Sequence, residues 1–520
     1  QGDAGDDTIL VRDLNFQSVD GGTGTDTLEL AGLKLKLNLA EVRGAIKDIE
    51  VIDLTGVEFP GSGTNTLTLT LQDLRDLSDT TDTFTVNGND GDHIFGLADG
   101  WVDEGKDGDF EIFTNSGTTL RVNSAVSTDF SARNAISLGS LDGSDGVRLV
   151  GVNNGDQPSS VSNAGDINGD GVDDVIVGAL SASSPNGDFS GSSYVVFGKT
   201  SGFNAALELS SLDGHNGFRM DGVKEKDFLG SSVSSAGDIN GDGFDDLIIA
   251  AEFASYAVFG KASGFEAVTD LSHLDGHNGF RMEGVAEMDQ LLRSVSNAGD
   301  INADGFDDLI VGASGNDSNI SSYVVFGKAT GFEAAIDLGG LDGTNGFRLD
   351  GAGFSVSNAG DINGDGFADL IVGTPDGSSN GYRSGTSYVF FGKASGFSAT
   401  MDLSSLDGSN GFRLDGLNTF DYFGLSVSTA GDMNGDGFDD MIIGAPRSSP
   451  NGTSSGSSFV VFGKAAGFSA EMDLSNFDSS TGIRLDGAVI GDQSGPSVSG
   501  AVDVDGDGYA DIMVGAPKAD

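Results

Sequence analysis

Short runs of alternating apolar and polar residues extend along the chain, and Gly, Asn and Asp separate them. Residues 49–54, 66–69, 83–86 and 110–113 alternate in this way, which predicts half-buried strands. Residues 71–77 are the stretch that suits a short helix. We found no long amphipathic helical pattern, so the sequence predicts an all-β protein of many short strands.

From about residue 135 onward the pattern repeats with a long period. Each unit has a short run, an acidic loop, an apolar run such as 309–313, an alternating run such as 193–199 and a final run such as 217–220. Successive acidic loops begin 72, 62, 61, 71 and 71 residues apart. This period suits a four-stranded propeller blade. The final run also occurs once before the first loop, at 146–149, so we expect five complete blades and the first two strands of a sixth.

The acidic loops have the form Asp-x-Asn/Asp-x-Asp-Gly-x-x-Asp. Side chains at positions 1, 3 and 5 can converge when the backbone curls, and Gly at position 6 permits a sharp turn. A backbone carbonyl at position 7 and a carboxylate at position 9 add further oxygen ligands, and hard oxygens in this number favour Ca²⁺ over Mg²⁺. One such loop could be an ordinary turn, but six filled copies favour about six Ca²⁺ sites that fix the blades. The predicted ligands are Asp166, Asn168, Asp170, Val172, Asp174, Asp238, Asn240, Asp242, Phe244, Asp246, Asp300, Asn302, Asp304, Phe306, Asp308, Asp361, Asn363, Asp365, Phe367, Asp369, Asp432, Asn434, Asp436, Phe438, Asp440, Asp503, Asp505, Asp507, Tyr509 and Asp511.

Residues 135–520 resemble the FG-GAP repeat of integrin α-subunit propellers and their bacterial relatives. The fit is clearest from Phe423-Gly424 through Asp432 to Gly444-Ala445-Pro446. The resemblance implies a β-propeller, usually of seven blades, with Ca²⁺ in the hairpin between the two inner strands, on the face opposite ligand binding. Phe-Gly is missing before some loops and Ala-Pro from most copies, but neither change touches a ligand. Six and seven blades both remain open.

The first 30 residues contain two Gly-rich segments. Residues 21–28 fit the pattern Gly-Gly-x-Gly-x-Asp-x-apolar, and residues 2–9 fit it with Asp3 in place of the second Gly. They resemble the end of an RTX-type nonapeptide block, which implies a parallel β-roll that binds Ca²⁺ near Asp7 and Asp26. It also implies type I secretion from a Gram-negative bacterium. A Gly-rich hairpin is the alternative.

Residues 31–134 are predicted to form a small β-rich domain that caps the roll, with a boundary near 127–135. The chain opens inside one motif and stops inside another, so we expect a fragment of a longer protein.

Composition narrows the classes of partner. The chain has 80 acidic and 26 basic residues and a formal net charge of −54, which disfavours nucleic acid and anionic membranes as partners. No apolar run approaches the roughly 18 residues of a membrane span. The absence of Cys excludes disulfides and thiol chemistry.

No enzyme motif stands out. His273 and His277 lie four residues apart around a predicted turn, and the Gly-x-Ser-x-Gly segments at 377–381 and 452–456 lack the strand-turn-helix setting of a nucleophile elbow. One Arg recurs in each unit, and we expect each to pair with a nearby Asp rather than to form an anion-binding ring. These residues are Arg148, Arg219, Arg281, Arg348, Arg413 and Arg484.

The sequence therefore predicts a non-enzymatic, extracellular Ca²⁺-binding protein at a cell surface or in a matrix. Its propeller would serve adhesion to an unidentified protein or polysaccharide. Two alternatives remain: a self-associating subunit of a Ca²⁺-dependent filament or surface layer, and the binding region of a larger secreted enzyme.

Overall fold

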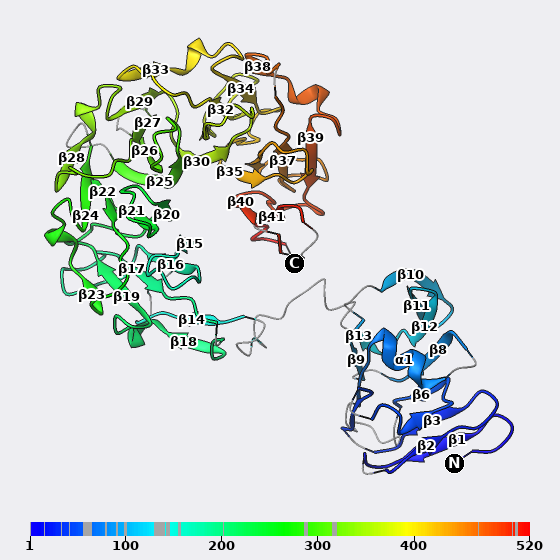
Figure 1. Ribbon diagram of the computed structural model, residues 1–520. Helices are drawn as coiled ribbons and strands as arrows, with labels where there is room; N and C mark the ends of the chain where they lie inside the picture. The colour runs from blue at the N-terminus through cyan, green and yellow to red at the C-terminus, as the bar shows by residue number, and fades with distance from the viewer. Residues whose placement is uncertain are drawn as a thin grey trace. The chain divides into compact units, whose positions relative to one another are not determined.

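The computed structural model describes residues 2–519 apart from 15, 33, 41, 56–64, 79–80, 90–91, 98–100, 129–140, 142–145, 154–155, 157, 201, 285–289, 315–319, 466, 502 and 505–507. The chain forms two compact units, Gln1–Leu141 and Asp142–Asp520, which are coloured from blue to red along the sequence in Figure 1. The predicted boundary near 127–135 lies close to this division.

The first unit is built mainly from parallel strands. Its largest sheet has the order β1-β3-β6-β8-β12-β11-β10, and two smaller sheets have the orders β13-β9-β7-β4 and β2-β5. The strands are β1 (Thr8–Val11), β2 (Val19–Asp20), β3 (Thr27–Leu30), β4 (Lys36–Asn38), β5 (Ile46–Lys47), β6 (Val51–Asp53), β7 (Thr66–Thr68), β8 (Thr83–Asn87), β9 (His93–Phe95), β10 (Val102–Asp107), β11 (Phe110–Asn115), β12 (Thr118–Asn123) and β13 (Ser127–Thr128).

Alternation explains how this unit buries its core. In β12 every second side chain is buried, and the buried residues join one cluster that includes Leu28, Phe84 and Phe113. The predicted strands at 49–54, 66–69, 83–86 and 110–113 are confirmed, as is the helix, α1 (Leu71–Leu77). Thr70 begins α1 with a capping box to Asp73.

The predicted division at residue 30 falls inside the largest sheet. β1 pairs with β3, and β3 pairs with β6, all in parallel. Residues on both sides of that division therefore share one hydrogen-bonded ladder, which alternation within single strands could not reveal. The parallel pairing is what a roll requires, while the RTX resemblance itself stays a prediction.

The second unit consists of four-stranded antiparallel blades, as the repeat predicted. The first is β15 (Ser160–Gly165), β16 (Asp174–Ala179), β17 (Ser192–Val196) and β19 (Gly217–Asp221); the second is β20 (Val233–Gly237), β21 (Asp246–Ala250), β22 (Ala254–Val258) and β24 (Gly279–Glu283); the third is β25 (Gln290–Gly299), β26 (Asp308–Ser314), β27 (Ile320–Val325) and β29 (Gly346–Asp350); the fourth is β30 (Ser355–Gly360), β31 (Asp369–Thr374), β32 (Thr386–Phe390) and β34 (Gly411–Asp415); the fifth is β35 (Ser426–Gly431), β36 (Asp440–Ala445), β37 (Ser457–Val461) and β39 (Gly482–Asp486). A sixth begins with β40 (Val498–Ala501) and β41 (Asp511–Val514).

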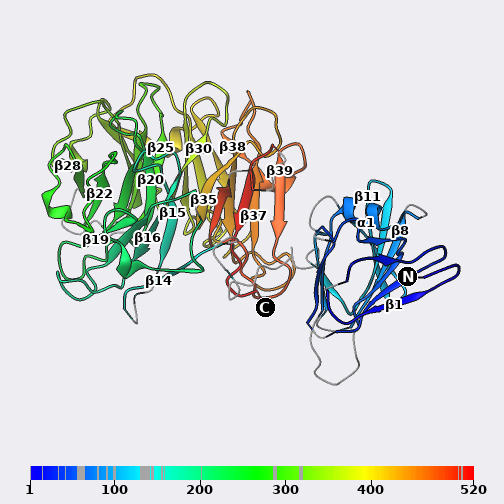
Figure 2. The ribbon, with the colours of Figure 1, turned by 60° about the horizontal axis from the view of Figure 1, so that its bottom comes forward.

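The first strands of successive blades line the inner side of an arc (Figure 1), and Figure 2 shows the blades side by side. Serine hydroxyls join these inner strands. The N–H of Val233 donates to Ser160 of the preceding blade at 3.1 Å, and the N–H of Val356 donates to Ser294 at 3.2 Å. This arrangement is the β-propeller that the repeat predicted.

Short parallel strands and 3₁₀ turns at the outer edges were not predicted. The strands are β14 (Arg148–Val150), β18 (Ala206–Glu208), β23 (Val268–Thr269), β28 (Ala335–Asp337), β33 (Thr400–Asp402) and β38 (Glu471–Met472), and the turns are η1 (Leu209–Ser211), η2 (Leu271–His273), η3 (Leu338–Gly340), η4 (Leu403–Ser405) and η5 (Leu474–Asn476). β23, β28, β33 and β38 each pair with the last strand of the preceding blade. β14 pairs with β18 in the same way, so β14 corresponds to the last strand of a blade, as predicted.

Phenylalanine pairs hold neighbouring blades together. Phe280 of the second blade stacks on Phe332 of the third with ring centres 4.7 Å apart, and Phe412 of the fourth stacks on Phe468 of the fifth at 4.6 Å. Each buried cluster between these blades combines residues of two neighbours. The hydrophobic core therefore lies mainly between blades, and no single unit of the repeat could bury it alone.

Candidate functional site

The acidic loops connect the first and second strands of the blades. The first loop runs from Asp166 to Asp174, directly after β15. The Gly at position 6 has a positive φ in all six copies: 85° at Gly171, 88° at Gly243, 91° at Gly305, 88° at Gly366, 89° at Gly437 and 93° at Gly508. A Cβ at these positions would meet no atom within 4 Å. The backbone conformation itself therefore requires glycine, as predicted.

Hydrogen bonds hold the loops in one shape. In the second loop, the carboxylate of Asp238 accepts the N–H groups of Asp242 at 3.0 Å and Gly243 at 2.9 Å. Asp242 in turn accepts the N–H of Phe244 at 3.1 Å. The same bonds occur in the first, third, fourth and fifth loops. In the sixth, Asp503 accepts from Gly508, while Asp505 and Asp507 lie outside the described residues.

In the first five loops the carboxylate at position 9 is the buried member of the set, whereas Asp511 of the sixth loop is partly exposed. Asp246 accepts the N–H of Ile239 at 3.1 Å and of Gly260 at 2.8 Å. The amide at position 3 also reaches the position-9 carboxylate: in the first loop, Asn168 Nδ2 lies 3.2 Å from Asp174 Oδ2. Positions 3 and 9 therefore meet, while positions 1 and 5 direct carboxylate oxygens to N–H groups of the loop.

Burial raises the pKa of the position-9 carboxylates. The pKa is raised to about 7 at Asp174, about 8 at Asp246, Asp308 and Asp369, and about 6 at Asp440. Loss of hydration is the largest cause, and the carboxylates at positions 5 and 1 of the same loop add to it, while backbone N–H groups oppose it. These carboxylates thus lie where positive charge would be most stabilising.

No preformed metal cluster is present among the described residues, because no three His, Asp or Glu side chains lie close enough together to hold an ion. The donor set nevertheless fits a hard cation. Each loop offers carboxylate and carbonyl oxygens within nine residues, and the first five add a side-chain amide oxygen. An oxygen that accepts one N–H retains a lone pair. The assignment of these loop residues as Ca²⁺ ligands stays a prediction.

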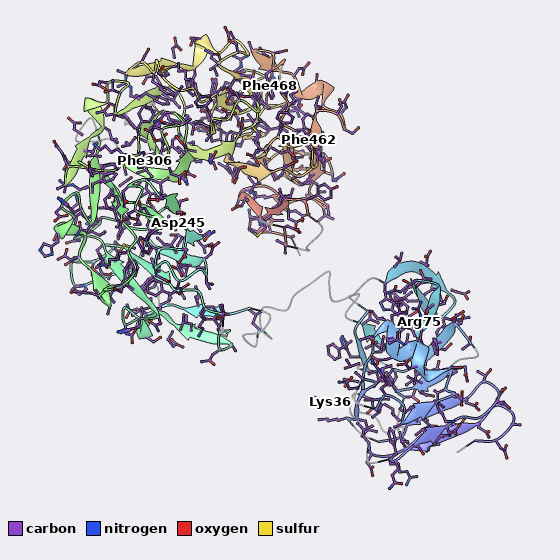
Figure 3. All side chains as sticks on the ribbon, in the orientation of Figure 1. Lys36, Arg75, Asp245, Phe306, Phe462 and Phe468 are labelled. Carbon is purple, nitrogen blue, oxygen red and sulfur yellow. The ribbon has the colours of Figure 1, made fainter. Side chains whose placement is uncertain are left out.

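Contacts between neighbouring loops were missed by the sequence analysis. The carboxylate of Asp245, at position 8 of the second loop, accepts the N–H of Asp166 in the first loop at 2.8 Å. Asp307 and Asp439 accept in the same way from Asp238 and Asp361. Asp245 and Phe306 are labelled in Figure 3. The recurrence of Asp at position 8 in four of the six loops is the signal that could have revealed this bridge.

The aromatic ring at position 7 also reaches the preceding loop. A Cβ on Gly241 would overlap the ring of Phe306, and one on Gly169 would overlap the ring of Phe244. The FGK segment that follows the third strand adds a bond, since the N–H of Lys328 donates to the carbonyl of Ile239 at 2.9 Å. Each loop is therefore fixed partly by the next blade.

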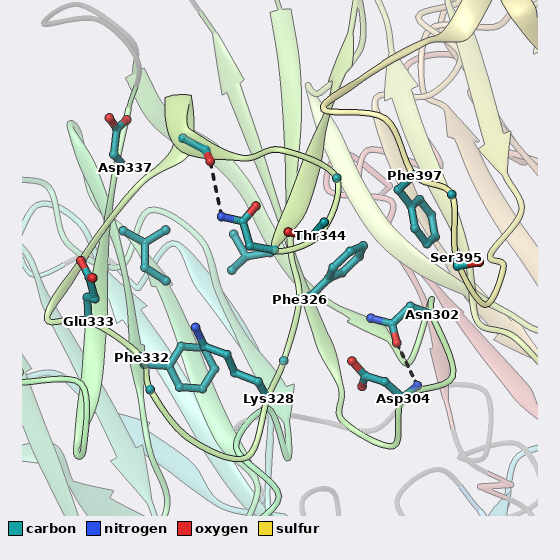
Figure 4. A pocket seen from close by; sticks show the side chains of 18 of the residues that line it. Asn302, Asp304, Phe326, Lys328, Phe332, Glu333, Asp337, Thr344, Ser395 and Phe397 are labelled. Carbon is teal, nitrogen blue, oxygen red and sulfur yellow. Dashed lines mark hydrogen bonds between the residues drawn. The ribbon is translucent and has the colours of Figure 1, made fainter.

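A cavity of about 770 Å³ opens beside the third loop (Figure 4). Asn302 and Asp304 of that loop line it, together with aromatic residues of the third and fourth blades. Lys328 Nζ lies 4.9 Å from the centre of the Phe332 ring, so this cation is already stacked. The cavity opens onto two of the predicted ligands and belongs to the loop region.

The amino-terminal candidates stack in register across the parallel sheet. Asp26 is 1% exposed, and its Oδ1 accepts the N–H of Asp7 at 2.8 Å. Glu50 of the next strand accepts the N–H of Asp26 at 2.8 Å. Asp26 Oδ2 has no hydrogen-bond partner among the described residues. Asp7 and Asp26 are thus brought together, but their metal binding remains a prediction.

Five of the six repeated arginines form ion pairs of the predicted kind, whereas Arg148 is followed by Val150 at the equivalent position. Each of the five lies two residues before an acid on the last strand of its blade, and the acid is Glu rather than Asp in one blade: Arg219 with Asp221 at 3.0 Å, Arg281 with Glu283, Arg348 with Asp350 at 2.6 Å, Arg413 with Asp415 at 3.0 Å and Arg484 with Asp486 at 2.7 Å. The side chains of His273 and His277 are 81% and 91% exposed, and each lies beside its own Asp. They do not form a shared site.

Comparisons with known proteins agree with this geometry. Six segments match the FG-GAP repeat. They are residues 158–196, 229–265, 292–329, 352–390, 423–461 and 494–520. Each FG-GAP segment contains one acidic loop and the strands on both sides of it.

Integrin α subunits are among the similar proteins. Integrin alpha-4 of Xenopus laevis is 32% identical over 167 residues, which is 31% of this chain and 14% of that protein. Integrin alpha-PS5 of Drosophila melanogaster is 32% identical over 169 residues, covering 32% and 15%, and integrin alpha-7 of Rattus norvegicus is 34% identical over 167 residues, covering 32% and 13%. The similarity thus covers about one seventh of each relative and supports an integrin-like FG-GAP propeller.

Among the described residues, no helix has both the length and the apolar character to span a membrane.

Proposed function

We propose that this chain is a non-enzymatic, extracellular protein whose propeller binds a ligand in adhesion and whose acidic loops hold Ca²⁺. The observation that carries the proposal is the repeated loop, in which the charges of the acids at positions 1 and 5 act on a buried position-9 carboxylate. Similarity to integrin α subunits supports a binding role.

The loop residues would hold the ion between the first two strands of a blade. Asp238 and Asp242 would turn one oxygen each toward it while keeping their N–H bonds, and Asp246 would join from the start of β21. When bound, Ca²⁺ would neutralise carboxylates that otherwise repel one another. Extracellular modules of this kind bind at roughly 10⁻⁴–10⁻³ M, so the loops would fill outside a cell and empty in its cytosol.

Contacts between neighbouring loops would pass the effect of bound Ca²⁺ from one blade to the next. Because Asp245 accepts the N–H of Asp166 and Phe306 packs on Gly241, a loop that changes shape disturbs its neighbour. Filled loops would therefore hold the blades in register and present a rigid opposite face to a ligand. Export by type I secretion from a Gram-negative bacterium is part of the same proposal.

A thermal melt followed by circular dichroism tests this function, first in millimolar Ca²⁺ and then in excess chelator. We expect chelation to lower the melting temperature markedly, with Mg²⁺ a poor substitute. An unchanged melt would remove the Ca²⁺ part of the proposal. Retention of the protein on cell or matrix surfaces, measured in the same two buffers, tests adhesion directly. A particle size that grows with Ca²⁺ in the absence of any surface would instead favour the filament subunit.

A further inference from the structure

The face opposite the acidic loops carries exposed apolar side chains. Antiparallel strand order places the connections between second and third strands, and those between blades, at this opposite end. Large apolar residues in these connections are 39–71% exposed: Phe189, Phe253, Tyr382, Phe420, Val489 and Ile490. Several large exposed apolar side chains on one face are typical of a binding surface.

Strained backbone presents some of these side chains. Phe420 has a φ of 67° and Tyr422 a φ of 56°, a conformation that non-glycine residues seldom adopt. Backbone bonds hold them there, since Phe420 N–H donates to Tyr382 O at 3.0 Å and Tyr422 N–H donates to Arg383 O at 3.2 Å. Phe189 and Phe228, where the first blade meets the second, also have positive φ, at 54° and 51°. Strain of this kind clusters at functional sites.

A cavity of about 510 Å³ opens on this face, between the connection from the fourth to the fifth blade and the loop after β36. This volume is in the usual range for small-ligand sites. Phe420 and Arg447 line it, together with the neutral polar residues Asn418, Thr419, Ser449 and Thr453. The carboxylate of Asp421 is buried and accepts the N–H of Asn418 at 2.8 Å.

Arg447 is the cation available to a ligand. It is exposed, forms no ion pair with any described residue, and lies over the ring of Tyr422 at 4.9 Å. Arg383 lies over Tyr422 at 5.7 Å and is paired with Asp376 at 3.0 Å, and Arg484 is paired with Asp486. An exposed guanidinium that has no ion pair with a described residue can form a charge-assisted, bidentate pair with the carboxylate of a ligand.

The turn that carries Arg447 recurs in other blades. The N–H of the following residue, Ser448, donates to Ala445 O, and the same turn occurs in the first, fourth and sixth blades. By this alignment the equivalent residues are Ser181, Asp376 and Lys518. Among these four turns, an arginine therefore stands only in the fifth blade, and the sixth has a lysine there.

We propose that this cavity binds a saccharide that carries a single carboxylate, with Arg447 on the carboxylate and Phe420 against the sugar ring. The inference rests on the proposed ligand-binding function and names a site and a ligand class for it. The ring of Phe420 is 49% exposed, and Tyr382 contacts it edge to face with ring centres 5.4 Å apart; the Phe420 ring therefore offers a surface for a sugar face. Hydroxyl and amide side chains around them suit sugar hydroxyls. The net charge of the chain disfavours a polyanion.

Isothermal titration of the full chain in Ca²⁺ tests the proposal with two matched probes, a trisaccharide ending in glucuronic acid and its glucose-terminated counterpart. We expect the acidic probe to bind at least tenfold more tightly. Arg447→Ala should weaken it by about ten- to hundredfold, Arg447→Lys by less, and Phe420→Ala by about tenfold. Phe189→Ala, which removes an exposed ring from another connection on the same face, is the control and should leave binding unchanged. Unaltered Ca²⁺-dependent melts would show that the variants fold.

Equal binding of both saccharides, equal loss in Phe189→Ala and Arg447→Ala, or binding of neither probe would overturn the proposal. So would equally tight binding of the tripeptide Gly-Asp-Gly, which would make the occupant an acidic protein side chain. Surface retention separates this result from the broader function. If the unsubstituted protein is retained on surfaces but binds neither saccharide, only the proposed saccharide site is wrong. If the unsubstituted protein is not retained on surfaces, the proposed adhesion function is wrong.

Discussion

Substitution of Gly241 by Ala probes the contact between neighbouring acidic loops. Gly241 has a φ of 74°, and an added Cβ would lie 2.9 Å from Cδ1 of Phe306 and closer still to Cε1. Gly243, two residues on, has a φ of 88° but open space at its Cβ. The two glycines therefore share a left-handed backbone conformation and differ in the contact with the next blade.

The expected cost can be worked out for each position. A left-handed conformation costs Ala roughly 1–2 kcal/mol, and the smaller entropy of its unfolded chain returns roughly 0.4–1 kcal/mol. Gly243→Ala should therefore cost about 1 kcal/mol. Gly241→Ala adds overpacking against Phe306, which costs roughly 1–3 kcal/mol more.

Hydrogen exchange measures this locally, as the opening free energy of amides at 238–247 and 300–309, so two-state unfolding of the whole chain need not be assumed. The double variant Gly241→Ala, Phe306→Ala closes a mutant cycle. We expect the extra cost of Gly241→Ala to shrink in the Phe306→Ala background. Equal costs at 241 and 243, or an unchanged difference in the double variant, would refute the argument that the ring at position 7 fixes the preceding loop.

Three further outcomes are expected. Asp245→Ala leaves the N–H of Asp166 without its carboxylate acceptor and should lower the local opening free energy by roughly 1–3 kcal/mol. Hydrogen exchange of the first loop measures this, and unchanged exchange would exclude a stabilising bond between the two loops. Phe332→Ala removes a buried ring that stacks on Phe280 and should cost roughly 3–5 kcal/mol, seen as loss of protection in both blades rather than in one. Burial raises the pKa of Asp227, so the folded state holds this proton more tightly than the unfolded state does. Stability should therefore fall as pH rises from about 4 through the raised pKa. Asp227→Asn should reduce this dependence of the opening free energy on pH, and the same pH dependence in the variant would contradict the reasoning.

Local patterns alone predicted much of the fold. Alternation identified the strands around residues 52, 67, 85 and 112 and the helix at Leu71–Leu77. Repetition identified four strands in each blade and the outlying strand β14. These features depend on side-chain period and on turn residues within a few positions, which sequence displays directly.

The organisation of the first unit could not be obtained in this way. Whether β3 pairs with β6 in parallel depends on partners about 24 residues apart, and alternation looks the same in parallel and antiparallel strands. The short outer strands β23 and β28 were missed for a related reason. They have only two or three residues, and it is the preceding blade that makes them strands.

The sequence by itself determined the loop chemistry: the acids at positions 1, 5 and 9, the Gly at position 6 and their sixfold recurrence. Tertiary structure decided what those residues touch. Burial against the FGK segment makes Asp246 the buried acid of its loop, and packing of Phe306 on Gly241 joins one loop to the next. It also brought Phe420 and Arg447 from separate connections to one cavity. Spacing along a chain determines which groups one turn can gather, whereas burial and contacts between blades arise only when distant segments pack.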